Sequence, residues 1–278
     1  MLVAHTYYTA GMHELAKVFV ESFCFYHGDL AIPLVIDAVG VDKNMVGDLV
    51  ARYPYTKVRP QQFRIGHLAR RCGVRKELLL KWKDQIEKGY VTRESRVWKL
   101  LMSGEQRVQV VRDLIAGLTG QRVGEDTLVV HFDIDTLFRG SIVPIVKEME
   151  GYTVGLKLRP KIQPVKARIT NDVMAIRCVD PSVLWLNTWV RMIEKIKPMD
   201  RPVGFGQISH WWAFEIMQKD PNFKVLTLPL KYGLPGRNKE EDVVWCGNVH
   251  KLRKDNCAVV FGDELKRLKK LNREKREA

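Results

Sequence analysis

Two aspartates separated by one residue stand at the end of an apolar stretch. In LVVHFDIDTLFRG, residues 128–140, the run before Asp133 and Asp135 is apolar or aromatic except for one histidine. Because residues i and i+2 of a strand project to the same side, both carboxylates can face one ion. Mg²⁺ and Mn²⁺ are usually held by a few carboxylates together with substrate phosphates. The pair therefore predicts a divalent-metal site that binds phosphates, and the alternative is two aspartates that cap a loop.

The elements around this pair have the pattern of an α/β protein. Apolar runs predict strands over residues 1–11, 31–40, 127–132, 152–159, 168–178 and 223–233. Apolar periodicity predicts helices over 12–26, 103–120, 182–196 and 207–219, and the pattern of residues 60–118 is helical as a whole. Strand, helix and strand in succession begin a parallel sheet. The pair then lies at the carboxyl edge, where open α/β sheets bind ligands.

The bulk properties predict one main domain over residues 1–262, with a basic helical insertion at about 60–100 and a charged helix or tail over 263–278. No apolar stretch reaches the roughly 18 residues of a membrane span, and the N-terminus shows no secretory signal pattern. Five scattered cysteines without a CxxC pair indicate reduced thiols. We therefore expect a cytoplasmic protein.

Charge points to polyanionic partners. The net charge is +14 and the isoelectric point about 9.6. Such an excess attracts nucleic acid first, with nucleotide substrates or anionic membrane surfaces as alternatives. Residues 63–99 alone hold eleven basic residues against four acidic ones. Within them, IGHLARRCGVRKELLLKW is similar to a helix-turn-helix with Gly73 at the turn. A basic, phosphate-binding surface is predicted there.

The order of several motifs resembles the GT-A glycosyltransferases, especially the glycogenin-like retaining group. HTYYTAGM, RVQVVRDLI and LVVHFDIDTLFRG follow one another as that family's first strand, basic helix and DxD strand do. RITNDVMAI, with Asn171 and Asp172, resembles its segment facing the donor sugar, and WCGNVHKLRKDN its C-terminal metal and phosphate motif. The sequence departs from the family after Asn171 and in lacking Gly and Pro around the C-terminal basic residue.

The resemblance implies a mixed central sheet flanked by helices, a divalent cation (Mn²⁺ or Mg²⁺), and a UDP-sugar or other nucleotide-diphosphate sugar as donor. It assigns the metal to Asp133, Asp135 and His250. It places the base near Tyr7 or Tyr8, and the ribose or phosphates near Arg107 or Arg112. It also implies diphosphate contacts from Lys251 or Lys254, and donor-sugar contacts from Asp172 or, as a weaker choice, Gln207.

A sugar-nucleotide site joined to a polyanion-binding face is similar to bacteriophage enzymes that glycosylate hydroxymethylated bases in DNA. The expected function is then a hexosyl- or pentosyltransferase that acts on a 5-hydroxymethylpyrimidine, in the host cytoplasm if the chain is phage-encoded. A base inside a duplex would have to be flipped outward to reach the metal.

Three alternatives stay open. The acceptor could be a lipopolysaccharide or a protein. VVHFDIDTL also resembles the nucleophile motif of haloacid-dehalogenase-type phosphatases, although Leu137 and the roughly 130 residues before the motif argue against that family. Finally, the chain could be a non-enzymatic helix-turn-helix DNA-binding protein in which the two aspartates are structural.

Overall fold

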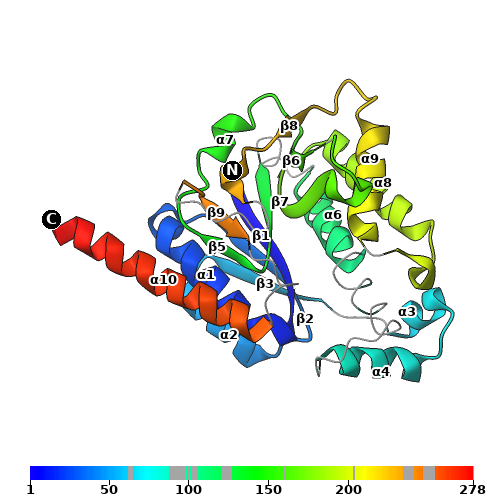
Figure 1. Ribbon diagram of the computed structural model, residues 1–278, viewed down its shortest axis with the longest axis horizontal. Helices are drawn as coiled ribbons and strands as arrows, with labels where there is room; N and C mark the ends of the chain where they lie inside the picture. Colours follow the sequence, from blue (N-terminus) through cyan, green and yellow to red (C-terminus); the bar gives the residue numbers. More distant parts are fainter. Residues whose placement is uncertain are drawn as a thin grey trace.

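A seven-stranded sheet lies between two layers of helices (Figure 1). The computed structural model describes residues 1–61, 65–87, 98, 101, 105–119, 127–159, 161–202, 204–233, 241–246 and 254–277. The strand order is β3-β2-β1-β4-β7-β6-β8, formed by Thr56–Gln61, Leu34–Val39, Leu2–Thr9, Leu128–Asp133, Ile169–Arg177, Val154–Leu158 and Val225–Thr227.

The sheet is mixed, as predicted. β3, β2, β1 and β4 are parallel, β7 is antiparallel to both β4 and β6, and β8 is parallel to β6. The central strands are covered on both faces, which is why β2 and β4 read as nearly continuous apolar runs. A second, two-stranded sheet pairs β5 (Thr136–Phe138) with β9 (Val244–Cys246).

Each face of the sheet has its own helical layer. α1 (His13–His27), α2 (Lys43–Arg52) and α10 (Lys254–Glu277) pack on one face, where Phe19 and Phe23 of α1 meet Phe138. α6 (Arg107–Leu118), α8 (Asp180–Glu194) and α9 (Phe205–Met217) pack on the other, where Trp185 and Trp189 are fully buried. Short helices in the described part of the chain include η1 (Ala10–Met12), η2 (Gly28–Leu30), α7 (Ile145–Glu148), η4 (Val165–Ala167), η5 (Pro198–Asp200) and η6 (Leu230–Tyr232).

Residues 65–87, the main described part of the basic segment, form two helices joined by a tight turn, as the pattern predicts. α3 (Ile65–Cys72) is followed by Gly73, whose φ of 69° is in the left-handed region that commonly ends a helix. α4 (Lys76–Glu87) begins three residues later. Leu79 and Trp82 belong to a small apolar core of their own under these helices. Figure 1 shows α3 and α4 at one end of the molecule, away from α10.

One buried carboxylate ties α3 to the main domain. Glu105, 3% exposed, accepts hydrogen bonds from Arg71 of α3 and from Arg201, the latter at 3.0 Å. A buried carboxylate needs such partners to remain charged. Part of the basic segment's charge is therefore structural.

Several boundaries differ from the sequence predictions. The helical pattern expected from residue 60 is wrong at its start, because Pro60 and Gln61 belong to β3. The strand expected over 223–233 is limited to β8, since Pro229 has no N–H to continue the ladder. The proposed division at 262/263 lies inside α10, whose Phe261 and Leu265 are buried in the core.

The last turns of α10 extend beyond the body of the molecule (Figure 1). None of the helices in the described part of the chain is long and apolar enough to cross a membrane.

The turn after η6 gives a test of the fold. Gly233 has a φ of 91°, and a Cβ there would lie 2.6 Å from Cys246 Sγ and 3.3 Å from the Val244 carbonyl oxygen. We expect Gly233→Ala to lower the free energy of unfolding by about 2–3 kcal/mol. In the exposed Gly117 of α6 a Cβ meets nothing within 4 Å, so Gly117→Ala should raise that free energy by up to about 1 kcal/mol. Urea unfolding of both variants measures the two changes in free energy. Equal changes in Gly233→Ala and Gly117→Ala would contradict the conformation described for Gly233.

Candidate functional site

The strand order reverses direction next to β1. The chain runs outward from β1 through β2 to β3 and then returns to place β4 on the opposite side of β1. In open α/β sheets, ligands bind outside the carboxyl ends of the strands at such a switch point. Tyr7 and Asp133 lie side by side at this place, because they are partners in the parallel register of β1 and β4.

The two predicted aspartates follow each other here. Asp133 ends β4 with a side chain 31% exposed, and Asp135 lies in the turn between β4 and β5. Arg107, at the start of α6, donates a hydrogen bond to Asp133. Burial, the charge of Asp133 and, more weakly, the charge of Asp172 raise the pKa of Asp135 to about 8. Negative charge at this edge is therefore incompletely compensated.

Asp172 brings a third carboxylate to the edge. Phe132 and Val173 are the last paired residues of β4 and β7, and Asp133 and Asp172 come directly beside them. Lys157 of β6 donates to Asp172 Oδ2 at 2.7 Å, and both side chains are almost fully buried. The other oxygen, Oδ1, is buried and has no partner among the described residues. One carboxylate oxygen is thus held while the other remains available.

The remaining predicted residues are distributed over the site, the core and the surface. Tyr7 is on the α6 side of β1, whereas Tyr8, 1% exposed, is in the core under α1 with its hydroxyl 3.3 Å from His13. Arg112 donates to its neighbour Asp113 in α6. Gln207 lies one turn before His210 on α9. His250 and Lys251 fall outside the described residues, and Lys254 begins α10 without a described side chain.

A chain of buried polar side chains runs from the edge of the sheet to Asp133. Asp37 of β2 accepts from Arg59 at 2.9 and 2.5 Å and from Gln61 at 2.6 Å. His5 Nε2 lies 2.8 Å from Asp37, and His5 Nδ1 lies 2.8 Å from Nδ1 of His131. His131 Nε2 is 4.0 Å from Asp133 Oδ1.

The electrostatics of this chain follow from burial and its contacts. Burial lowers the pKa of both His5 and His131. Burial acts to raise the pKa of Asp37, but the hydrogen bonds from His5 and Arg59 outweigh it and hold that pKa below its usual range. The chain is therefore built from neutral imidazoles and a charged carboxylate.

His5, Asp37 and His131 were not predicted as site residues from the sequence. A signal was present, because each central strand carries a titratable side chain inside an apolar run: LVAHTYYT, LVIDAV and LVVHFD. A buried titratable residue requires a partner. Since the partners come from neighbouring strands, the strand order is needed to pair them.

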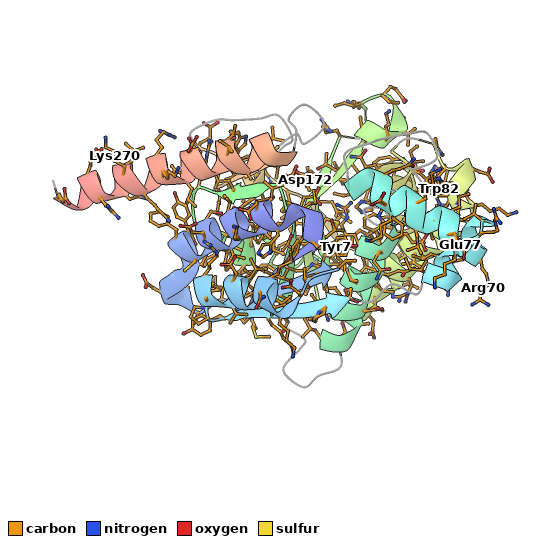
Figure 2. The ribbon with its side chains drawn as sticks, turned by 90° about the horizontal axis from the view of Figure 1, so that it is seen from below. Tyr7, Arg70, Glu77, Trp82, Asp172 and Lys270 are labelled. Carbon is orange, nitrogen blue, oxygen red and sulfur yellow. The ribbon has the colours of Figure 1, made fainter. Side chains whose placement is uncertain are left out.

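The carboxylates of Asp133, Asp135 and Asp172 form a cluster of oxygen ligands. The cationic side chains of Arg107 and Lys157 lie next to it. Within the described ranges, no three histidine, cysteine or acidic side chains are already gathered around one point. Asp133 and Asp135 could supply two oxygen ligands to a divalent cation, whose remaining ligands would come from elsewhere in the chain or from a substrate. Figure 2 shows Tyr7 and Asp172 in the middle of the molecule, with Arg70 at one end and Lys270 at the other.

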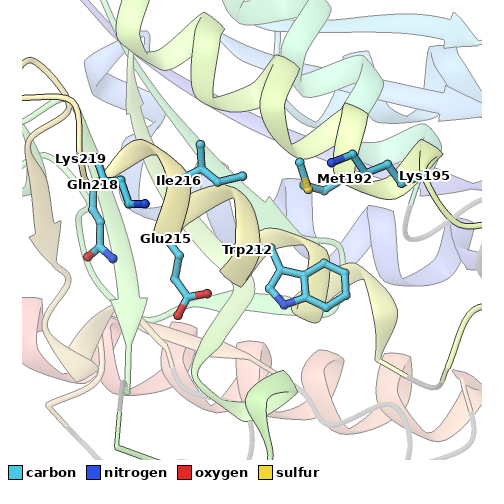
Figure 3. Close-up of a pocket in the computed structure, with 7 residues that line it drawn as sticks. All are labelled: Met192, Lys195, Trp212, Glu215, Ile216, Gln218 and Lys219. Carbon is cyan, nitrogen blue, oxygen red and sulfur yellow. The ribbon is translucent and has the colours of Figure 1, made fainter.

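A separate hollow of about 540 Å³ opens on the solvent side of α8 and α9 (Figure 3). Trp212 and Ile216, which are 38% and 46% exposed, are among its lining residues. None of the predicted site residues lines it. The hollow is therefore distinct from the carboxylate cluster.

The raised pKa of Asp135 predicts a pH-dependent stability of the metal-free protein. The free energy of unfolding should fall as pH rises from about 3.9, the pKa of an aspartate in the unfolded chain, toward about 8, the pKa of Asp135 in the folded protein. Asp135→Asn should therefore unfold at higher urea than the parent at pH 8, and this difference should shrink toward pH 4.5. Asp263→Asn is the control, because Asp263 is exposed on α10. A parent protein equally stable at pH 5 and 8 would contradict the charge cluster.

Comparisons with known proteins support the architecture. No protein-family model matches the sequence, and no curated protein is detectably similar to it. The chain is similar to mouse xyloside xylosyltransferase 1 in its apo form, with a TM-score of 0.50 and 12% identity over 90% of this chain and 99% of that one. It is also similar to an active-site mutant of LgtC, with a TM-score of 0.51 and 10% identity over 95% and 96% of the two chains. At these identities the likeness shows the fold alone, and this chain has the GT-A fold.

Proposed function

We propose that the protein is a metal-dependent glycosyltransferase that moves a sugar from a nucleotide-diphosphate sugar, such as a UDP-sugar, to an acceptor hydroxyl. The observation that carries this proposal is the position of Asp133 and Asp135 at the switch point of a GT-A fold. The GT-A fold of two glycosyltransferase structures supports it. The cytoplasm is the expected location, in a host cell if the chain is phage-encoded.

The two aspartates fit a divalent cation. Their hard oxygen ligands suit Mn²⁺ or Mg²⁺, and the raised pKa of Asp135 indicates that a positive charge is needed to keep both carboxylates ionised. Asp133 and Asp135 would hold the ion together with His250, the third ligand that the resemblance to GT-A glycosyltransferases implies. When bound, the ion would neutralise the charge that develops on the departing diphosphate.

The other residues would bind and orient the donor. Arg107, released from Asp133 when an ion takes its place, would donate to the diphosphate, as would Lys251 or Lys254. Asp172 would accept a hydrogen bond from a donor-sugar hydroxyl through its available Oδ1, while Lys157 holds Oδ2. Gln207 is the second residue proposed for the sugar.

The base would lie beside Tyr7, which shares the face of Asp133. Tyr8 has no part in this proposal because it is packed in the core on the other face of the sheet. Arg112 has none because its guanidinium is already paired with Asp113.

For the acceptor we favour DNA that contains a 5-hydroxymethylpyrimidine. Arg70, Arg75, Lys76 and Lys81 are exposed on α3, α4 and the turn between them, and they form the phosphate-binding surface of this proposal. Arg71 is excluded from that surface because it is bonded to Glu105. Phosphate contacts of this kind depend strongly on salt concentration.

Removal of one metal-binding carboxylate tests the catalytic proposal. Asp135→Asn should reduce Mn²⁺-dependent sugar transfer and nucleotide-sugar hydrolysis by on the order of a hundredfold or more, because charge stabilisation of the leaving group is lost. DNA binding should be unchanged. Product formation is followed by the mass of hydroxymethylated DNA, with Asp263→Asn as the control that retains activity. Transfer that survives in Asp135→Asn, or a parent protein that never transfers sugar or hydrolyses the donor, contradicts the proposal.

Charge reversal on α3 and α4 tests the acceptor. The triple variant Arg70→Glu, Arg75→Glu and Lys81→Glu should weaken DNA binding and reduce the slope of log affinity against log salt by about 3. Hydrolysis of the donor without DNA should be retained. Reversal of Lys266 and Lys270, both exposed on α10, is the control. If neither binding nor transfer responds to the triple variant, a saccharide or protein acceptor replaces DNA.

A further inference from the structure

His131 has one ring nitrogen without a partner in a place where solvent does not reach it. The residue is 0% exposed, and its Nε2 has no hydrogen-bond partner among the described residues. A buried polar atom without a partner is unfavourable for stability, so it requires an explanation. This nitrogen lies on the same side of β4 as Asp133, since the two residues are separated by one position.

The neighbouring contacts determine which nitrogen of His131 carries the proton. The carboxylate of Asp37 is 2.8 Å from His5 Nε2, so that nitrogen donates to it. Asp37 is already neutralised by the two hydrogen bonds from Arg59, which leaves no unbalanced negative charge for a second cation at His5. His5 is then neutral, and its Nδ1 can only accept.

The short contact between the two imidazoles completes the assignment. Because His5 Nδ1 accepts, Nδ1 of His131, 2.8 Å away, must be the donor. A neutral imidazole with its proton on Nδ1 has a lone pair on Nε2. The lone pair of His131 is therefore directed toward the carboxylate region without a proton to share.

Two groups with lone pairs do not attract each other, but a cation between them binds both. His131 Nε2 and Asp133 Oδ1 are 4.0 Å apart. Metal–ligand distances of about 2.0–2.1 Å allow two ligands of one ion to be up to about 4.2 Å apart. Metal-binding histidines also commonly donate their other ring N–H to a partner that fixes the tautomer, as His131 does toward His5.

The side chain of Arg107 shows what the cation would replace. Arg107 donates to Asp133 through one terminal nitrogen, while its own Nε is buried without a partner among the described residues. In this arrangement an acceptor on His131 and a donor on Arg107 both remain unsatisfied around Asp133. A cation bound by His131 and Asp133 would satisfy the first and free Arg107 for the diphosphate.

We propose that His131 Nε2 is a ligand of the divalent cation beside Asp133, and that His5 and Asp37 are positioning residues that hold it in the required tautomer. This inference rests on the proposed function, because it uses the same ion. It adds a nitrogen ligand from within β4 to the carboxylates and His250.

The experiment measures Mn²⁺ binding directly, without donor or turnover. The affinity is obtained from the electron paramagnetic resonance signal of free Mn²⁺, and nitrogen coordination from the ¹⁴N modulation of the bound ion. His131→Gln should weaken Mn²⁺ binding at least about tenfold. His210→Gln is the matched control, because His210 is also fully buried, is bonded through Nδ1, to Asn171, and has an unpartnered Nε2. The Mn²⁺ affinity of His210→Gln should stay within about threefold of that of the parent protein.

A second variant makes the result independent of whether His131→Gln folds. His250→Gln keeps His131, so its bound Mn²⁺ should still show ¹⁴N modulation. Carboxylate-only coordination in His250→Gln, or parent-like binding by His131→Gln, overturns the role of His131 and leaves the proposed function standing. A parent protein that binds no Mn²⁺ overturns both.

Discussion

Negative charge concentrated at the carboxyl edge of β4 is the constraint on which the surrounding structure depends. Burial and the neighbouring carboxylates, including Asp172, raise the pKa of both Asp133 and Asp135. Lys157 and Arg107 offset only part of this charge. Such an arrangement is unfavourable for stability alone, since buried carboxylates without full compensation destabilise a fold. It is favourable for a protein that binds a divalent cation and a phosphate ester there.

The sheet supplies the rigid framework for that charge. Because β1 and β4 are adjacent and parallel, their carboxyl ends meet, and the residues that emerge there have fixed neighbours. The same adjacency places His5 beside His131 in the interior, two and three strands, respectively, from the edge strand β3 that carries Arg59. The polar chain therefore runs from strand to strand across the sheet as far as His131, and each contact depends on the register.

The sequence allowed the elements with strong apolar patterns to be predicted, but not those defined by their neighbours. The central strands, α1, α8 and α9 were predicted close to their observed bounds, and Asp133 and Asp135 occupy the expected end of a strand. β3 was not predicted because TKVRPQ is polar and belongs to an edge strand that pairs only with β2. α2 was not predicted because it buries only Leu49.

The candidate site, too, could be predicted only where the pattern along the chain is sufficient, and not where it depends on neighbouring elements. Motif order indicated the carboxylates and Arg107, since spacing along the chain is sufficient for them. As consecutive residues of a strand, Tyr7 and Tyr8 must face opposite sides of the sheet, but motif order did not indicate which of them is packed in the core under α1. The role of Lys157 also requires the strand order, since β6 reaches Asp172 only through its pairing with β7.

The shared carboxylate of Glu105 has a structural consequence. Glu105 accepts hydrogen bonds from Arg71 of α3 and from Arg201 of the main domain. It precedes Arg107, the first residue of α6, by two positions. The contacts of Glu105 therefore link the outer helices to the segment that leads into α6. Removal of the two outer helices would leave this buried carboxylate without Arg71, two residues before the arginine that is bonded to Asp133.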